Sequence, residues 1–426
     1  MSTTETLETT QGGSEQESKI EVSSTTTCEP KNTPSRSKKL REKAYAIFLR
    51  YWFLLGLAIV IGLAWAFPQV GKTNGDIEAQ YTVKWGAVIL IFLLSGLGLE
   101  VSVMLKTILR WRLHLIVQFI NFILLPFVMY GIVRFFIAVH SDLDMTVYKG
   151  WMIALSTSTT VSSNAIMTRN ANGNDGAALF NAALGNVLGI FISPALMTAF
   201  QNDPIVFEPG TDRGNPDYLK VLKTLGSTVL APLVVGQIIR YLFPVRVKYL
   251  ATKFKFPIIN SLALLCLVWS VFCDGVASDA FTKMTGVDIV AIIFVDIFMY
   301  GFGCVACLFV ARLPWPTKKE PKWVSKWRFS RKDSVAIMYC GATKTVSMGI
   351  PLINVLYSES SYGVVGVLSL PLLMYHICQL FIGNFQVPLL KKWVEKDEQD
   401  MEEEAQVLPR QEPVRTPHLR KRIDRK

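Results

Sequence analysis

Ten long apolar stretches, separated by short polar or charged segments, follow one another along this chain between residues 51 and 390. Each is at least eighteen residues long, which is enough for a helix to cross the hydrocarbon core of a bilayer. We therefore predict an all-α polytopic membrane protein. The ten transmembrane helices are expected at 51–68, 83–105, 113–138, 150–167, 176–199, 221–243, 257–275, 288–311, 334–356 and 362–390.

Polar residues interrupt the fourth and the ninth apolar stretch. The tripeptide Thr160–Ser162 in the fourth recurs as Thr345–Ser347 in the ninth, at the same ordinal place in each half of the chain. Interrupted segments at corresponding places in two halves are typical of the binding site of a secondary transporter. Because each half has an odd number of helices, the halves are expected to be inverted five-helix repeats.

Composition and charge support this interpretation and give it an orientation. The chain is 51% hydrophobic, and its net charge of +11 is better explained by cytosolic loops than by nucleic-acid binding. Connecting segments on one side hold seventeen Lys or Arg, against seven on the other. Both termini are therefore expected in the cytosol, as a disordered tail at 1–44 and a second tail at 394–426.

Lys344 is the most unusual residue within the predicted spans. A charge at membrane depth costs about 2.5–3.5 kcal/mol on insertion scales, so it normally faces protein or water. One interpretation is a lysine that extends to the interface; the other is an internal cation between the interrupted helices. For the second, we predict an ion pair with Asp296, the ionisable residue inside the preceding span.

Other polar side chains in the spans are candidates to bind an ion or solute. Their oxygens suit a hard cation, but hydrogen bonds between helices explain them equally well. His376 and Gln379 share a helical face and either line the site or serve in packing, whereas Glu100, Gln118 and Asn121 are expected at the cytosolic margin. The remaining candidates are Ser162, Ser163, Asn164, Asn181, Asn186, Thr343, Thr345 and Ser347.

Nothing in the sequence predicts an enzyme, a cofactor or a metal centre. There is no P-loop, nucleophile elbow or His-rich motif, and the hydroxyls of the polar runs have no nearby His to activate them. Cys304 and Cys307 have the spacing of metal ligands, but they lie in an apolar span and are interpreted as packing residues. The expected partners are the lipid bilayer and a small solute or ion.

The chain resembles the bile acid:sodium symporter superfamily over residues 45–393. It is most similar to the branch that contains a vertebrate orphan carrier and the fungal solute-carrier regulators of calcium homeostasis. The motifs that carry the resemblance are Ser95–Leu99, Ser162–Ile166, Gly173–Asn181, Leu188–Ile190, Ser193-Pro194, Tyr339–Gly341 with Lys344, Gly349–Pro351, Ser369–Leu373 and Tyr375-His376.

This resemblance implies a core domain (113–199 and 288–390) and a panel domain (51–105 and 221–275), with broken helices 4 and 9 crossing in the core. In sodium-coupled members, an Asn on helix 4 and a Glu-containing motif on helix 9 bind two sodium ions. Asn164 matches the first, but Ala342, Thr343 and Lys344 replace the second. A fixed ammonium repels sodium or substitutes for it.

The resemblance also implies a function in calcium homeostasis. We expect a plasma-membrane solute carrier that limits calcium entry when external calcium is high, directly or through a calcium channel partner. The alternative is a sodium- or proton-coupled organic-anion symporter, in which Lys344 is the counter-charge of the anion. A regulatory interaction protein is a third class, in which the tails matter more than the polar runs.

Overall fold

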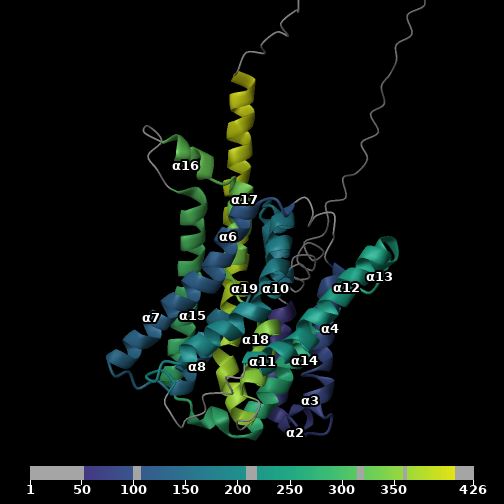
Figure 1. The fold of residues 1–426 in the computed structure, drawn as a ribbon, viewed down its shortest axis with the longest axis vertical. Helices are drawn as coiled ribbons and strands as arrows, with labels where there is room; N and C mark the ends of the chain where they lie inside the picture. Colours follow the sequence, from purple (N-terminus) through teal and green to yellow (C-terminus); the bar gives the residue numbers. More distant parts are fainter. Residues whose placement is uncertain (1–51, 99–106, 208–217, 314–320, 358–361, 408–426) are drawn as a thin grey trace, which may run out of the picture. The chain divides into compact units, whose positions relative to one another are not determined.

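The computed structural model describes residues 52–98, 107–207, 218–313, 321–357 and 362–407, and in these ranges the chain is helical and contains no strand. Figure 1 shows the arrangement of the helices. They are α2 (Pro68–Gly71), α3 (Ala79–Thr82), α4 (Gly86–Gly98), α6 (Trp111–Phe119), α7 (Leu125–Ala138), α8 (Met145–Ser156), α9 (Ser162–Asn170), α10 (Asp175–Gln201), α11 (Tyr218–Leu225), α12 (Ala231–Leu242), α13 (Pro244–Lys253), α14 (Phe256–Ala277), α15 (Gly286–Arg312), α16 (Lys322–Trp327), α17 (Arg331–Ala342), α18 (Val346–Leu356) and α19 (Tyr362–Val407), with the π-helices η1 (Ile120–Leu124) and η2 (Gly226–Leu230) and the 3-10 helix η3 (Ala280–Lys283).

Among the described residues, eight helical segments are long and apolar enough to cross a membrane, which confirms an all-α polytopic protein. They are Ala79–Gly98, Trp111–Ala138, Asp175–Gln201, Tyr218–Leu242, Phe256–Ala277, Gly286–Arg312, Arg331–Leu356 and Val364–Lys396. The first predicted span is a shorter apolar helix, Trp52–Ala66. The fourth is divided into α8 and α9.

The two predicted interruptions are present. Helix α8 ends before the extended residue Thr157, and α9 begins five residues later at Ser162. Helix α17 likewise ends before the extended residue Thr343, and α18 begins at Val346. Ser and Thr side chains favour such interruptions because their hydroxyls bind nearby backbone groups in non-helical conformations.

The helices pack in two groups. Helix α4 contacts both α12 and α14, while α8, α15, α17 and α18 gather around α19, which α14 also contacts. Gly96 of α4 and Gly236 of α12 allow two backbones to meet, since a Cβ on either glycine would clash with the facing main chain. Small residues commonly permit this close approach between membrane helices.

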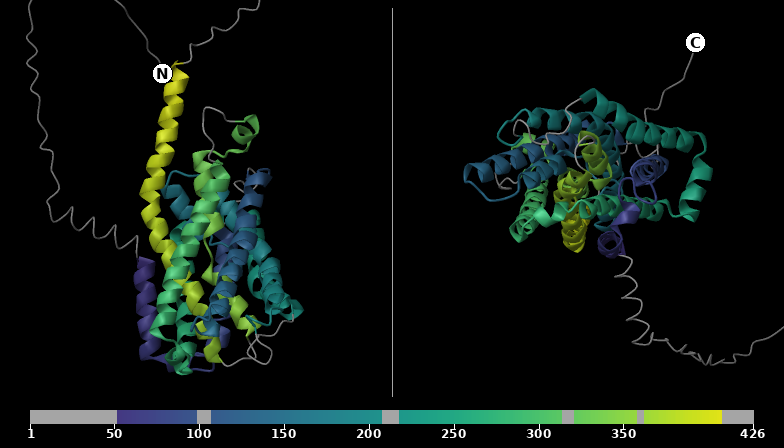
Figure 2. Two further views of the ribbon diagram at one scale, coloured as in Figure 1. Left: turned by 90° about the vertical axis from the view of Figure 1, so that its left-hand side faces the viewer. Right: turned by 90° about the horizontal axis from the view of Figure 1, so that it is seen from below.

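The predicted connection 244–256 contains a short helix, α13, between two spans that lie where they are predicted. One predicted boundary is wrong. Helix α19 does not end near residue 390 but continues to Val407, and its last turns extend past the neighbouring helices (Figures 1 and 2). The acidic run Glu395–Glu404 is rich in strong helix formers, which explains why the polar sequence stays helical. The predicted tail 1–44, the end of the chain from residue 408 and Glu100 lie outside the described residues.

The contact between α4 and α12 yields a stability prediction. Gly96→Ala places a methyl group against the Leu233 carbonyl and should lower the free energy of unfolding by about 1–3 kcal/mol. Gly98→Ala is the matched control, because a Cβ there meets nothing within 4 Å. Thermal unfolding of the purified variants measures the difference. Equal melting temperatures would show that these helices are not closely packed.

Candidate functional site

The two helix interruptions contact each other through their main chains. The Thr345 amide donates to the carbonyl oxygen of Ser158 at 2.8 Å, although the two residues are far apart in the sequence. Both interruptions are buried, and backbone groups at membrane depth need such internal partners because the lipid offers none. This crossing joins elements from both halves of the chain and is the candidate site.

A cluster of hydroxyl and amide groups lies at the crossing. The Thr159 and Thr343 hydroxyls are 2.7 Å apart, and Asn164 bridges them. Its Nδ2 donates to Thr159 Oγ1 at 2.8 Å, and its Oδ1 lies 2.9 Å from Thr343 Oγ1. All three side chains are buried, so in this conformation their polar atoms satisfy one another across the two halves.

Lys344 extends into the protein interior and is fully buried. Its Nζ donates to the carbonyl oxygens of Asn121 at 2.6 Å and Thr157 at 3.0 Å, and it lies 5.9 Å from the centre of the Phe122 ring. The geometry excludes an ammonium that extends to the membrane surface. The interpretation as an internal cation is consistent with these contacts.

The predicted ion pair between Lys344 and Asp296 is wrong. Asp296 is completely buried on α15, and its carboxylate oxygens make no hydrogen bond among the described residues. Lys344 instead finds its acceptors in main-chain carbonyls at η1 and at the end of α8. The prediction failed because it counted only side-chain charges as partners for the ammonium.

Gln379 and His376 of α19 hold the backbone at the second interruption. The Gln379 amide accepts from the Lys344 N–H at 2.8 Å and donates to the Lys344 carbonyl at 2.7 Å. His376 Nδ1 lies 2.7 Å from Gln379 Nε2. The two side chains therefore replace hydrogen bonds that the broken helix has lost. Sequence reasoning had placed them in a lining or packing role.

The two asparagines of α10 occupy different environments. Asn186 lies at the crossing, where its Oδ1 accepts from the Ser158 hydroxyl at 2.8 Å. Asn181 lies away from it and contacts His114 Nδ1 at 3.0 Å. In this structure the two side chains therefore belong to different hydrogen-bonding groups.

The remaining predicted hydroxyls form local pairs beside the crossing. Ser163 bonds the Thr160 hydroxyl, and Thr345 bonds the Ser347 hydroxyl, each at 2.8 Å. Ser162 lines a cavity of about 510 Å³ that lies between α9 and α10 on one side and α4, α13 and α14 on the other. The cavity extends from Ser162 to Arg169 and Thr252, which belong to predicted cytosolic connections.

Sequence reasoning missed the position of Asn121. It was predicted at the cytosolic margin, but it is fully buried at the crossing. Its Nδ2 donates to the carbonyl oxygens of Gly341 at 3.2 Å and Thr343 at 3.0 Å, at the end of α17. The signal for this role was a polar residue in an apolar stretch, five positions before Pro126.

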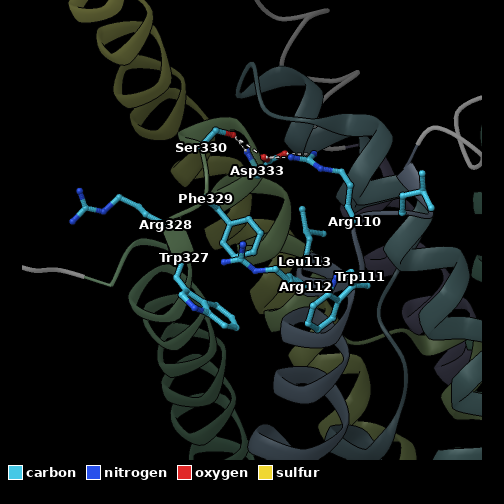
Figure 3. Close-up of a pocket in the computed structure, with 10 residues that line it drawn as sticks. Arg110, Trp111, Arg112, Leu113, Trp327, Arg328, Phe329, Ser330 and Asp333 are labelled. Atoms are coloured by element: carbon cyan, nitrogen blue, oxygen red, sulfur yellow. Dashed lines mark hydrogen bonds and ion pairs between the residues drawn. The ribbon is translucent and has the colours of Figure 1, made fainter. Parts of the chain in front are cut away.

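A second cavity, of about 410 Å³, lies where α6 and α17 begin (Figure 3). Figure 3 shows Arg110 and Ser330 directed at the carboxylate of Asp333, which Arg110 binds through two nitrogens at 2.7 and 2.6 Å. Hydrogen bonding to this carboxylate raises the pKa of Arg110 above its usual value. Beside this pair, the Arg112 guanidinium stacks on Trp327 at 4.1 Å. The Arg110–Asp333 pair fixes the start of α17, the helix that leads to the second interruption.

The hydroxyl–amide cluster predicts a large effect of removing its central residue. Asn164→Ala leaves the buried Thr159 and Thr343 hydroxyls without their bridging partner and should cost about 1–3 kcal/mol of stability. The control is Asn170→Ala, at an exposed position on the same helix. Thermal unfolding compares them. Similar melting temperatures for both variants would mean that the cluster contributes nothing to holding the interruptions together.

Comparison with known proteins places the chain in a family. Residues 51–392 match the model of the SBF-like CPA transporter family. Proteins named solute carrier RCH1 are 32% identical in Candida albicans, over 87% of this chain and 95% of theirs, and 34% identical in Saccharomyces cerevisiae, over 82% and 85%. The sodium/bile acid cotransporter 7 of Danio rerio is 28% identical over 80% and 94%. These relatives are named as transporters rather than enzymes. The chain belongs to the SBF-like CPA transporter family, a branch of the bile acid:sodium symporter superfamily.

Proposed function

We propose that this solute-carrier-type membrane protein moves a small solute past the crossing of its interrupted helices, and that this activity limits cytosolic calcium. The observation that carries the proposal is the hydrogen-bonded contact between the two interruptions, next to a cavity that begins at Ser162. A binding site between discontinuous helices is the arrangement that secondary transporters use.

The proposed architecture has ten membrane crossings arranged as two inverted repeats of five. Helix Trp52–Ala66 and the α8–α9 pair would complete the set with the eight longer spans. The core would comprise 113–199 and 288–390, and the panel 51–105 and 221–275. The packing of α12 and α14 on α4 supports this division, and the contact of α14 with α19 joins the proposed panel to the proposed core. Movement of the core against the panel would open the cavity to either side in turn.

The proposed orientation places both termini in the cytosol and the protein in the plasma membrane. The excess of Lys and Arg in alternate connections supports it. In Figure 1, α16 lies at one end of the helical bundle and α2 and α3 at the other, as expected if α16 belongs to a cytosolic connection and α2 and α3 to an external one. The cavity then opens toward the cytosol, because Arg169 and Thr252 line its outer part.

The proposed effect on calcium follows the resemblance to fungal regulators of calcium homeostasis, whereas the RCH1 relatives support the solute-carrier class. We propose that calcium is not the transported ion, because the buried ammonium of Lys344 would repel a divalent cation at the crossing. The protein would lower calcium entry through the solute that it moves, or through a calcium channel that responds to it.

Organic-anion transport is the second candidate function. Lys344 does not fit the role of counter-charge, because main-chain carbonyls already surround its Nζ. The exposed Arg169 lies at the mouth of the cavity but is paired with Asp175 at 2.7 Å, so an entering anion would compete with that carboxylate. Apolar residues such as Leu94 and Phe256 line the same cavity and would suit an amphipathic molecule.

Blocking the cavity tests whether it lies on the transport path. Ala165→Trp fills the space beside Ser162, whereas Leu115→Trp places the same ring at an exposed apolar position on α6. After a pulse of external calcium, cells carrying Ala165→Trp should show the enlarged cytosolic calcium signal of cells that lack the protein. Cells carrying Leu115→Trp should respond like wild type. A normal response with Ala165→Trp at normal expression would remove the cavity from the mechanism.

Uptake into liposomes distinguishes the two candidate functions. Purified protein is reconstituted and supplied with a labelled bile acid, with sodium or with choline as the external cation. The calcium-regulating carrier predicts no sodium-dependent uptake of the anion. Uptake that rises severalfold with sodium would favour the organic-anion symporter and count against the primary proposal.

A further inference from the structure

The carbonyl oxygen of Asn121 is left without a helical donor by the sequence that follows it. In the π-helix η1, the Leu125 amide bonds the Ile120 carbonyl, one residue earlier than an α-helix requires. By the same pattern, the Asn121 carbonyl would accept from residue 126. That residue is Pro126, which has no N–H. A buried carbonyl at membrane depth therefore needs a donor from elsewhere.

A second carbonyl faces the same point from the end of α8. Thr157 follows the last helical residue and is extended, so the chain leaves the helix and no longer returns N–H groups to its last carbonyls. The C-terminal end of a helix carries partial negative charge. The Thr157 oxygen and the Asn121 oxygen together form a pair of acceptors that suits one small cation.

The Lys344 ammonium occupies the position between these two oxygens. Its distances to them, 2.6 and 3.0 Å, are those of charge-assisted hydrogen bonds, and the Phe122 ring lies 5.9 Å from the Nζ. A sodium ion here would share the same oxygens and be repelled by the ammonium. The residues at this point therefore do not fit a sodium ion.

We propose that the two carbonyls form a monovalent-cation site that the protein fills permanently with its own Lys344 side chain. The crossing then keeps the charge of a bound cation without taking an ion from solution. The inference rests on the proposed carrier function for its biological meaning. Its test does not, because it measures stability and needs no transported solute.

Asn121 is the positioning residue of this site. Its main-chain oxygen binds the ammonium, while its side-chain Nδ2 binds the Gly341 and Thr343 carbonyls at the end of α17. One residue thus fixes both the cation and the helix end from which Lys344 extends. The arrangement resembles the use of main-chain carbonyls for cations in channel filters.

Chemical rescue tests the proposal. Lys344→Ala removes the ammonium and leaves space for an added amine, so its melting temperature should fall and then rise by more than about 3 °C with n-propylammonium chloride, in a saturable way. n-Propanol, which fills the same space without charge, should not restore it, nor should choline chloride at equal ionic strength. Lys344→Met keeps the space filled and should not respond to the amine.

The wild-type protein provides an independent measurement in case the alanine variant does not fold. Its melting temperature should be the same in sodium, potassium and choline chloride, because the site already holds its cation. A saturable rise specific to sodium would overturn the proposal. So would equal responses of Lys344→Ala to n-propylammonium and n-propanol, which would mean that the side chain only fills space. A normal calcium response with Ala165→Trp, which would count against the carrier proposal, would leave this result unaffected, so the two proposals fail separately.

Discussion

Interrupting a helix inside a membrane exposes backbone groups that lipid cannot satisfy, and this constraint organises the centre of the protein. Each interruption supplies part of what the other lacks: the Thr345 amide reaches the Ser158 carbonyl, and the Asn164 side chain joins hydroxyls from both. Gln379 then binds both polar groups of the Lys344 backbone. Hydrogen bonds between the two interruptions therefore hold the halves of the chain together. Neither interruption could pair all of its polar groups without the other.

The charge at the crossing follows the same constraint. Helix ends and π-helical turns leave carbonyl oxygens without a donor from their own helix. Several such oxygens together form a negative environment without any acidic side chain. Among the described residues, the hydrogen-bond acceptors of Lys344 Nζ are two main-chain oxygens and not a carboxylate. Asp296 of α15 is also completely buried, and its carboxyl oxygens make no hydrogen bond among the described residues.

The general fold and the two interruptions could be predicted because they depend on local composition. Long apolar runs identify helices, and the clustered hydroxyls around Thr160 and Thr345 identify the places where helices stop. The partners of Lys344 could not be predicted. They are main-chain carbonyls, which every residue has, so the residue types do not indicate which of them lie near Lys344. The position of Asn121 depends on the π-turn before Pro126, and the end of α19 depends on helix propensity in a segment that is not apolar.

The continuity of α19 gives the crossing a mechanical connection to the rest of the protein. Gln379 binds the backbone of the second interruption through its side chain. The same helix continues to Val407, about 42 Å further along its axis. Between these points, Arg331 of α17 donates to the Trp393 carbonyl, so α19 is also bonded to the helix that precedes Lys344. Displacement grows with distance along a tilted helix. A small tilt of α19 near Gln379 would therefore move the far end of this helix by a larger distance.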